Sequence, residues 1–364
     1  MFKKESRLGA REAFAMIILM LGVKISNTTP SLFAQYGGNA FWMMPFISIV
    51  VILPSILLLY YLLRKYKNKN LVELSEQIMG KTVGKILCFI LFLIFFSMMA
   101  VEGRSYTEQL KLLYFPETPT PFIFFVFFLI AFYGAKRGLE TIGSTSWLFL
   151  FYIKASVFLL VVLAFREAIF MRIFPIFGKG LSLLLIEGAK KASLFSDFFI
   201  LAMVYNVFDS SKKFTRGILT GFVFIFFEMT FFFLLYCTIF DYNSIDKVAF
   251  PFHELTQYVD IGAFFTNIET FFMIFWLFAA YIKYMIYLYC ISWIFGAIFN
   301  IKEFEPLILP FAFFGVVFGM IPENAVMNEL VFKARLMDIA TPILIAFPVL
   351  LWIVAKLKGE LKRL

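Results

Sequence analysis

The sequence predicts an all-α integral membrane protein with ten transmembrane helices. Of its 364 residues, 62% are hydrophobic and only 16% are charged, whereas about a quarter of the residues of a soluble domain are charged. Apolar runs of about 18 residues or more, which are long enough to cross the hydrocarbon core, recur along the chain. The ten predicted spans cover residues 12–35, 40–63, 84–111, 120–135, 141–165, 183–208, 214–240, 261–297, 305–321 and 337–356.

The charge pattern predicts the topology. The net charge is +9, but the basic residues lie between the spans, so the positive-inside rule explains them and nucleic acid is not implied as a partner. With ten spans, basic residues concentrate on the side that carries both termini, which we therefore place in the cytoplasm. The opposite side holds Arg166, Arg172, Lys179, Lys247, Lys333 and Arg335. No large soluble domain interrupts the chain, so residues 1–364 form one membrane domain whose surroundings are lipid.

Neither a metal site nor an enzyme is predicted. Cys88, Cys237 and Cys290 all lie inside apolar runs and have no paired spacing, so no disulfide or metal framework is indicated. The chain has no Walker loop, HExxH or GxSxG motif. We therefore expect no cofactor.

The first span is interrupted. Within LMLGVKISNTTPSL, Leu19–Leu32, glycine weakens the helix and Pro30 removes a backbone donor. Irregular backbone at membrane depth is tolerated where it is buried in protein or lines a wet cavity, and a half-helix that starts after a break points its positive end at the gap. Such a gap suits a carboxylate; the alternative is a proline kink repaired by Ser and Thr, with no ligand. The candidate ligand-binding residues here are Gly22, Lys24, Ser26, Asn27, Thr28 and Thr29.

The second to fourth spans are continuous in pattern. A short amphipathic helix is predicted between the second and third, from Asn70 to Gly80. In the third span, Glu102 and Tyr106 are four residues apart and share one helical face, which makes them candidates for the same cavity. Arg104 and Glu108 have the same spacing, and we expect them in the headgroup region.

The fifth span contains Lys154 deep within its apolar sequence. An intramembrane lysine is costly, by about 2.5–3.5 kcal/mol on insertion scales, so it needs a partner or water. Two interpretations remain open: a coupling role, by proton exchange or as a substitute for a cation, and a structural hydrogen bond to carbonyls of a broken helix.

The sixth span repeats the interruption of the first. Small and polar residues from Lys190 to Asp197 lie among apolar ones, about half a chain away from the first break. This spacing predicts a 5+5 inverted repeat, over about residues 10–166 and 183–357, with its first helices broken near the midplane. Asp197 would bind a ligand amine or act as counter-ion of Lys24, unless it lies nearer the outer surface. The candidate residues of this break are Ser193, Phe195, Ser196 and Asp197.

The remaining spans carry fewer candidates. The segment 241–260 is predicted to be an external loop with a short interfacial helix. In the eighth span, Lys283 lies farther in than Glu269, and the ninth span contains a GxxxG at Gly315 and Gly319, which permits close helix packing.

Several motifs in order resemble the B subunits of Ger-type spore nutrient-germinant receptors, within the amino acid–polyamine–organocation transporter superfamily. The resemblance covers nearly the whole chain, although Ser144 and Asn267 stand where this family is expected to have arginine. The motifs are the spacing of Gly22, Pro30 and Ser31; GNAFW ending at Trp42; SEQIMGKTVGK from Ser75; PETP, Pro116–Pro119; KRGLETI from Lys136; FPIFGKG, Phe174–Gly180; and the segment from Phe250 through Trp276 to Tyr289.

The resemblance implies a LeuT-like fold in the inner membrane of a bacterial spore. It implies a subunit that acts with A and C subunits and binds a small germinant, such as an amino acid, a sugar or a nucleoside, between the first and sixth helices. Two other functions stay open: an autonomous proton-coupled amino-acid permease, and a subunit that conducts water or ions.

Overall fold

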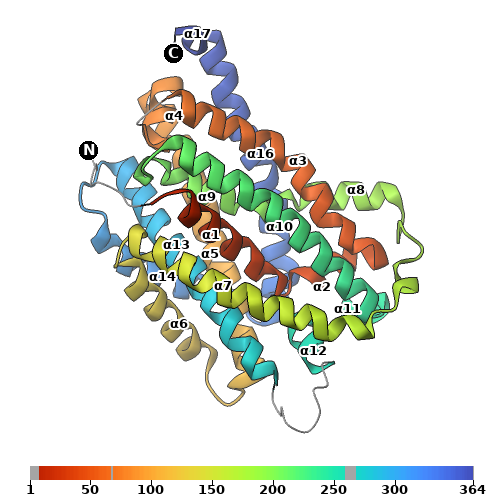
Figure 1. Cartoon of the computed structure of the whole chain (residues 1–364). Helices are drawn as coiled ribbons and strands as arrows, with labels where there is room; N and C mark the ends of the chain where they lie inside the picture. Colours follow the sequence, from red (N-terminus) through yellow and green to blue (C-terminus); the bar gives the residue numbers. More distant parts are fainter. Residues whose placement is uncertain (1–7, 67–68, 259–267, 364) are drawn as a thin grey trace.

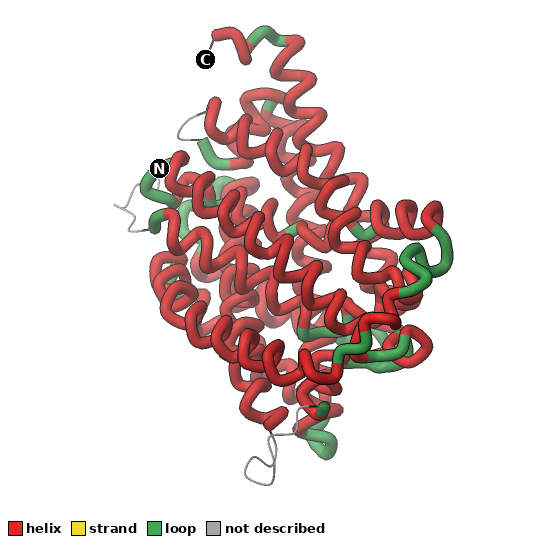
Figure 2. Tube along the Cα trace, turned by 45° about the vertical axis from the view of Figure 1, so that its right-hand side comes forward, coloured by secondary structure: helices red, strands yellow, loops and turns green. Residues whose placement is uncertain are grey.

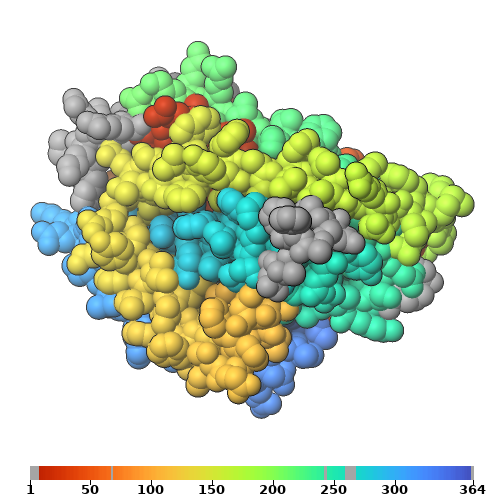
Figure 3. Space-filling model, turned by 60° about the horizontal axis from the view of Figure 1, so that its bottom comes forward, coloured from red at the N-terminus to blue at the C-terminus, as the bar shows by residue number. Residues whose placement is uncertain are grey.

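The computed structural model describes residues 8–66, 69–258 and 268–363, and this part of the chain folds into helices and connecting loops (Figures 1 and 2). The predicted segments 1–7 and 261–267, with Asn267, and Lys67 lie outside the described residues. Both ends of the described chain lie at the same end of the molecule (Figure 1). The face turned forward in Figure 3 is formed by α6 (Thr120–Ala135), α7 (Leu139–Ala164), the turn between α5 (Lys81–Tyr114) and α6, α13 (Ile268–Phe299) and the 241–258 segment.

Each predicted span corresponds to helix in the structure. Among the described residues, six helical stretches are long and apolar enough to cross a membrane, two more apolar helices are shorter, and two spans are interrupted. The count of ten crossings therefore stays a prediction, because it assigns one crossing to each short or interrupted helix. The continuous helices are α3 (Met44–Lys65), α5 (Lys81–Tyr114), α6 (Thr120–Ala135), α7 (Leu139–Ala164), α10 (Ser211–Ile239), α13 (Ile268–Phe299), α14 (Ile308–Gly319) and α16 (Ala334–Leu357).

The two predicted interruptions are present. The first span is divided into α1 (Ala10–Gly22), a 3₁₀ turn Val23–Ile25 and α2 (Thr29–Gly37). The sixth is divided into α8 (Leu181–Lys190), a 3₁₀ turn Ala192–Phe195 and α9 (Asp197–Met203).

The short helices also follow the sequence. The helix α4 (Leu71–Met79) starts at a capping box in which Asn70 Oδ1 accepts from Glu73 N at 2.8 Å and Glu73 Oε2 accepts from Asn70 N at 3.0 Å. It ends at Gly80, whose φ of +87° suits glycine. The segment 241–258, predicted to be external and called the external segment below, carries α11 (Tyr242–Ile245) and α12 (Pro251–Gln257).

Glycines bring the central helices close together. A Cβ on Gly217 of α10 would lie 2.2 Å from the carbonyl oxygen of Ala10, so α1 and α10 pack backbone to backbone there. The GxxxG of α14 packs within the chain: a Cβ on Gly315 would lie 2.6 Å from the Phe128 ring, and one on Gly319 would lie 2.5 Å from the Phe124 ring. α1 is consequently enclosed by α7, α10 and α13 at the centre of the molecule.

Three charged residues that the sequence assigns to the outer side of the membrane are buried in the protein. Lys333, assigned to an external loop, lies in a π-helical turn (Asn328–Lys333) that leads into α16, and only 4% of its surface is exposed. Arg104 and Glu108, expected in the headgroup region, are buried in the protein and pair at 2.6 Å. These residues are buried because the π-helical turn and α16 begin earlier than the apolar pattern indicates and pack against α5.

Candidate functional site

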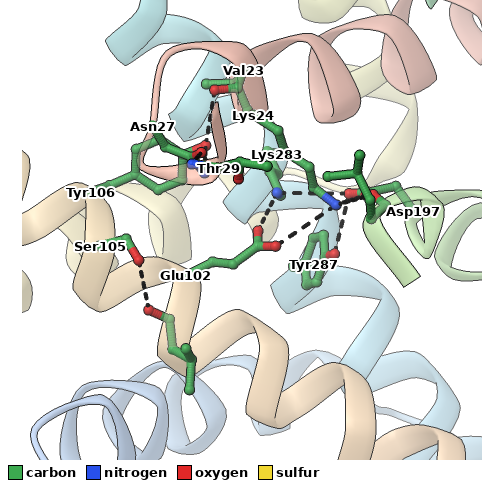
Figure 4. Close-up of polar contacts among 12 residues, drawn as sticks. Val23, Lys24, Asn27, Thr29, Glu102, Ser105, Tyr106, Asp197, Lys283 and Tyr287 are labelled. Atoms are coloured by element: carbon green, nitrogen blue, oxygen red, sulfur yellow. Dashed lines mark hydrogen bonds and ion pairs between the residues drawn. The ribbon is translucent and has the colours of Figure 1, made fainter. Parts of the chain in front are cut away.

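The two interrupted helices face each other and are joined by an ion pair (Figure 4). Lys24 of the first break places its Nζ 2.5 Å from Asp197 Oδ2, at the start of α9, and 2.6 Å from the Leu194 carbonyl oxygen. Asp197 is fully buried and Lys24 is 1% exposed. Asp197 thus does not lie near the outer surface, and it is the counter-ion of Lys24 in this structure.

A second pair completes a buried tetrad, which we define as Lys24, Glu102, Asp197 and Lys283. Lys283 of α13 donates to Glu102 of α5, and its Nζ lies 3.9 Å from Asp197 Oδ1. Glu102 Oε1 lies 3.7 Å from Lys24 Nζ. Two ammonium groups and two carboxylates therefore balance one another inside the protein, so no charge of the tetrad is left unpaired. Tyr287 supports the tetrad by donating to Asp197 Oδ1 at 3.2 Å.

Side chains from α5 and α10, and from the break itself, satisfy the backbone that the first break frees. Tyr106 donates to the Val23 carbonyl at 3.2 Å, and Asn27 Nδ2 donates to the Tyr106 hydroxyl at 3.3 Å. Asn27 Oδ1 also accepts from Thr29 N at 2.8 Å, which satisfies the first backbone amide of α2. Gln109 and Tyr236 donate to the carbonyls of Ser26 and Ile25, each at 3.0 Å. Glu102 and Tyr106, candidates that share one face of α5, contact the tetrad and the first break respectively, and Gln109 and Tyr236 are additions that only the structure reveals.

Thr28 connects the first break to the π-helical turn. Its hydroxyl donates to Glu329 and accepts from Lys333 Nζ at 2.6 Å, while Lys333 and Glu329 pair at 3.0 Å. Ser105 of α5 donates to the same carboxylate (Figure 4). A π-helical turn frequently marks a functional site, because its widened ladder changes the directions of its side chains. Neither Glu329 nor Lys333 was among the candidate site residues predicted from the sequence.

The second break is held by Thr341 of α16. Its hydroxyl accepts from Ser193 N at 2.9 Å and donates to the Lys190 carbonyl at 2.6 Å, and Ser193 Oγ donates to the Met337 carbonyl at 3.0 Å. Phe195 is fully buried in the apolar core. The hydroxyl of Ser196 is buried and has no hydrogen-bond partner within the described residues.

Lys154 lies beside Gly22 at the end of α1, and its Nζ pairs with Glu228 Oε1 of α10 at 2.5 Å. The second oxygen of Glu228 is buried and unpartnered within the described residues. The partner of Lys154 is therefore an acid on a neighbouring helix. Both Glu228 and Lys283 carry the signal that singled out Lys154, a charged side chain within an apolar span.

Three cavities surround the first break. A pocket of about 220 Å³ is bounded by Thr28 and Glu329 on one side and by Asp246 and Lys247 of the external segment on the other; we call it the vestibule. Two voids of about 20 and 30 Å³ lie deeper, one beside Glu102 and Ser193 and one beside Gly22, Ser26 and Lys154. Each void has room for a water molecule or two but not for a nutrient. The contact of Thr28 with Glu329 thus lies between the vestibule and the tetrad.

The described residues contain no group of three or more His, Cys, Asp and Glu side chains that could hold a metal ion. Cys88, Cys237 and Cys290 are buried free thiols.

The fold is that of LeuT-type transporters. The structure aligns with a substrate-bound, outward-open Na⁺-coupled sialic acid symporter with a TM-score of 0.67 and 14% identity, over 87% of this chain and 75% of that one. It aligns with a nucleobase-cation-symport-1 family transporter, in a closed conformation with bromovinylhydantoin bound, with a TM-score of 0.62 and 15% identity, over 96% of this chain and 76% of that one. At this identity the likeness is one of fold alone.

Two relatives come from Bacillus subtilis (strain 168). The spore germination protein YndE is 23% identical over 98% of both chains. The putative spore germination protein YfkT is 26% identical over 137 residues, which are 38% of this chain and 37% of YfkT. The spore germination protein family matches residues 7–327. The fold, the apolar helices and this match identify a non-enzymatic integral membrane protein, and the chain belongs to the spore germination protein family.

Proposed function

We propose that this chain is the nutrient-sensing membrane subunit of a spore germinant receptor, which binds a small zwitterion, an amino acid, between its two interrupted helices. The observation that carries the proposal is the buried, charge-balanced tetrad, in which Lys24 and Asp197 join the two breaks. An amino acid has one carboxylate and one ammonium group. The tetrad offers Lys24 to bind the carboxylate and Asp197 to bind the ammonium group.

Charge balance explains why an amino acid suits this site. A ligand carboxylate that inserts beside Lys24 and a ligand ammonium that inserts beside Asp197 would replace one ion pair by two, and the buried site would stay neutral. A ligand with a single net charge would leave one buried charge uncompensated, at a cost of several kcal/mol. A sugar or nucleoside could bind only by hydrogen bonds, and it would have to displace the Lys24–Asp197 pair without replacing its charges.

The vestibule supplies the path to this site. Its volume of about 220 Å³ is close to the lower end of the range for small-molecule pockets. The contact of Thr28 with Glu329 closes it toward the tetrad, so ligand binding requires α2 and the π-helical turn to separate. This movement would be the signal that A and C subunits in the spore inner membrane receive, and no solute needs to cross the membrane for it.

The test is a germination dose–response in a spore strain whose sole receptor contains this chain. Amino acids, sugars and nucleosides are compared for the wild type, Lys24→Gln and Asp197→Asn, with Lys190→Gln as the matched control. Lys190 precedes the second break and pairs with Glu187 outside the tetrad. We expect amino acids to be the active class and both tetrad variants to need at least tenfold more germinant, with normal amounts of protein in the membrane. Unchanged dose–responses in both tetrad variants would contradict the proposed site.

A second function, proton-coupled amino-acid transport, is favoured by one observation. The Lys154–Glu228 pair lies inside the protein beside the first break, next to a void large enough for water. Such a pair could exchange protons as the helix moves. Uptake of a radiolabelled amino acid by liposomes that contain this chain alone would support the permease, whereas germination that depends on the chain without any uptake supports the receptor.

A further inference from the structure

We propose that a groove between α3 and α10 binds the phosphate-bearing headgroup of an anionic phospholipid. The two helices run side by side (Figure 1), and the groove between them has a volume of about 370 Å³. It lies at the C-terminal end of α3 and the N-terminal end of α10, outside the vestibule and the tetrad. The proposal does not depend on the proposed function.

Unpaired basic groups form one end of the groove. Arg64 and Lys65 are the last residues of α3 and line the groove. Within the described residues, neither has a carboxylate partner. By contrast, Lys213 on α10 pairs with Asp209. A phosphate has the charge and the oxygen acceptors that two such cations bind.

A polar group without a partner lies beside them. Thr215 of α10 lines the groove, and its hydroxyl oxygen is buried and makes no hydrogen bond within the described residues. Buried hydroxyls are nearly always hydrogen-bonded in folded proteins. A headgroup oxygen in the groove would give Thr215 an acceptor.

The rest of the groove is apolar, which distinguishes a lipid from a free phosphate. Leu57 and Tyr61 lie on the same face of α3 as Arg64, at spacings of four and three residues, and they are 45% and 47% exposed. Leu219 lies one turn after Thr215 on the facing helix. This strip leads from the basic end toward the middle of the membrane, as an acyl chain does. A free phosphate would leave it uncovered.

The position also fits an anionic leaflet. The ends of α3 and α10 that line the groove lie at the end of the molecule where the described chain begins and ends (Figure 1), and the positive-inside pattern predicts this end to be cytoplasmic. Anionic lipids give that leaflet a negative surface potential, and basic pockets between helices on that side bind their headgroups.

One residue links the groove to the tetrad. Tyr60 lines the groove, and its hydroxyl donates to the carbonyl oxygen of Phe198 at 2.8 Å. Phe198 directly follows Asp197 in α9. A lipid that holds α3 against α10 would therefore also hold α9, the second half of the interrupted sixth span. Bound lipid would restrict the movement of α9.

The proposal is tested with the full-length protein in nanodiscs of phosphatidylcholine and of phosphatidylcholine with phosphatidylglycerol. Bound phosphatidylglycerol is counted by native mass spectrometry, and Tm is measured in each nanodisc. The variants are Arg64→Gln with Lys65→Gln, and Leu57→Trp, which fills the apolar strip without changing charge. The matched control is Lys136→Gln with Arg137→Gln, another consecutive basic pair at the end of a helix.

We expect phosphatidylglycerol to raise the Tm of the wild type and of the control. Removal of two basic residues should weaken its binding by about 25-fold, since each contributes roughly fivefold, and Leu57→Trp should abolish the adduct. If the variant with Arg64→Gln and Lys65→Gln fails to fold in phosphatidylcholine, the binding of phosphatidylglycerol to Leu57→Trp alone tests the proposal. Equal binding to all variants, or no preference for phosphatidylglycerol, overturns the proposal. An equal Tm rise with inorganic phosphate in detergent would show a free-anion site and overturn the lipid assignment.

Discussion

Lys154 fills the space that a side chain at position 22 would need: its Nζ lies 2.9 Å from the place where a Cβ on Gly22 would be. The end of α1, just before the first break, is therefore packed directly against an ammonium group that pairs with Glu228 at 2.5 Å. The absence of a side chain at Gly22 is what allows the pair to form beside the interrupted helix.

From this relationship we expect Gly22→Ala to disturb the pair. The methyl group would displace the flexible end of Lys154 and lengthen its contact with Glu228, so the Tm should fall, by an amount equivalent to about 1–2 kcal/mol. The control is the same substitution in a Lys154→Met background, where no ion pair remains. There Gly22→Ala should cost less, because the two changes act through one contact. Equal losses in both backgrounds would mean that Gly22 acts through the helix alone.

The second prediction concerns the ion pair that joins the two breaks. Lys24→Met and Asp197→Leu each leave an uncompensated buried charge, so each should lower the free energy of unfolding by about 3 kcal/mol or more. The double variant Lys24→Met with Asp197→Leu leaves no unpaired charge at this contact and should lose much less than the sum. Denaturant unfolding in detergent micelles measures all three. Additive losses would be inconsistent with a direct pair.

The third prediction concerns the contact that closes the vestibule. Thr29 lies on the tetrad side of Thr28, beside the void of about 20 Å³. The cysteine of a Thr29→Cys variant should therefore react slowly with a membrane-impermeant thiol reagent. Glu329→Ala removes the acceptor of the Thr28 hydroxyl and should speed this labelling about tenfold. The native buried cysteines are first replaced by alanine.

The matched control for that experiment is Glu108→Ala, because Glu108 also lines the vestibule but pairs with Arg104 instead of Thr28. Its labelling rate should stay close to that of the parent protein. A rate that rises equally in both variants would show that the general loss of a vestibule carboxylate, and not the Thr28 contact, controls access.

The fourth prediction is a pH dependence in the external segment. His253 of α12 packs its ring against Tyr114, with the centroids 5.9 Å apart. Burial lowers the pKa of His253 below its ordinary value of 6.5, although Glu254 and Glu269 act in the opposite direction. The stability that the neutral imidazole contributes is therefore present above about pH 6.5 and is lost as the pH falls toward the lower folded-state pKa. Backbone amides of α12 should exchange faster at pH 5 than at pH 7.5, after correction for the intrinsic rate. In His253→Phe the corrected rates should no longer depend on pH.

The local pattern was sufficient to predict most of the fold. The short helix after Asn70 and its end at Gly80 depend on capping and on a positive φ, which are properties of a few adjacent residues. The interruption at Ser26–Thr28 is local too, since a run of small polar residues before Pro30 cannot continue a helix in hydrocarbon without partners. The resemblance to a germinant-receptor family was also carried by short motifs in order, and the family match confirms it at the level of the spore germination proteins.

The sequence by itself determined that this is a helical membrane protein with two interrupted helices, because apolar length and helix-breaking residues are recorded locally. Only the tertiary structure decided which charges meet. The sequence left two partners possible for Lys24, Asp197 and the carboxylate of a ligand. The packing of α9 against α1 brings Asp197 to it in this structure. Lys333 was placed outside by its neighbours, and the π-helical turn carries it inward to Thr28. Both outcomes depend on contacts between residues 173 and 305 positions apart, and a buried charge is stabilised by whichever partner the packed helices bring near it, wherever that partner lies in the chain.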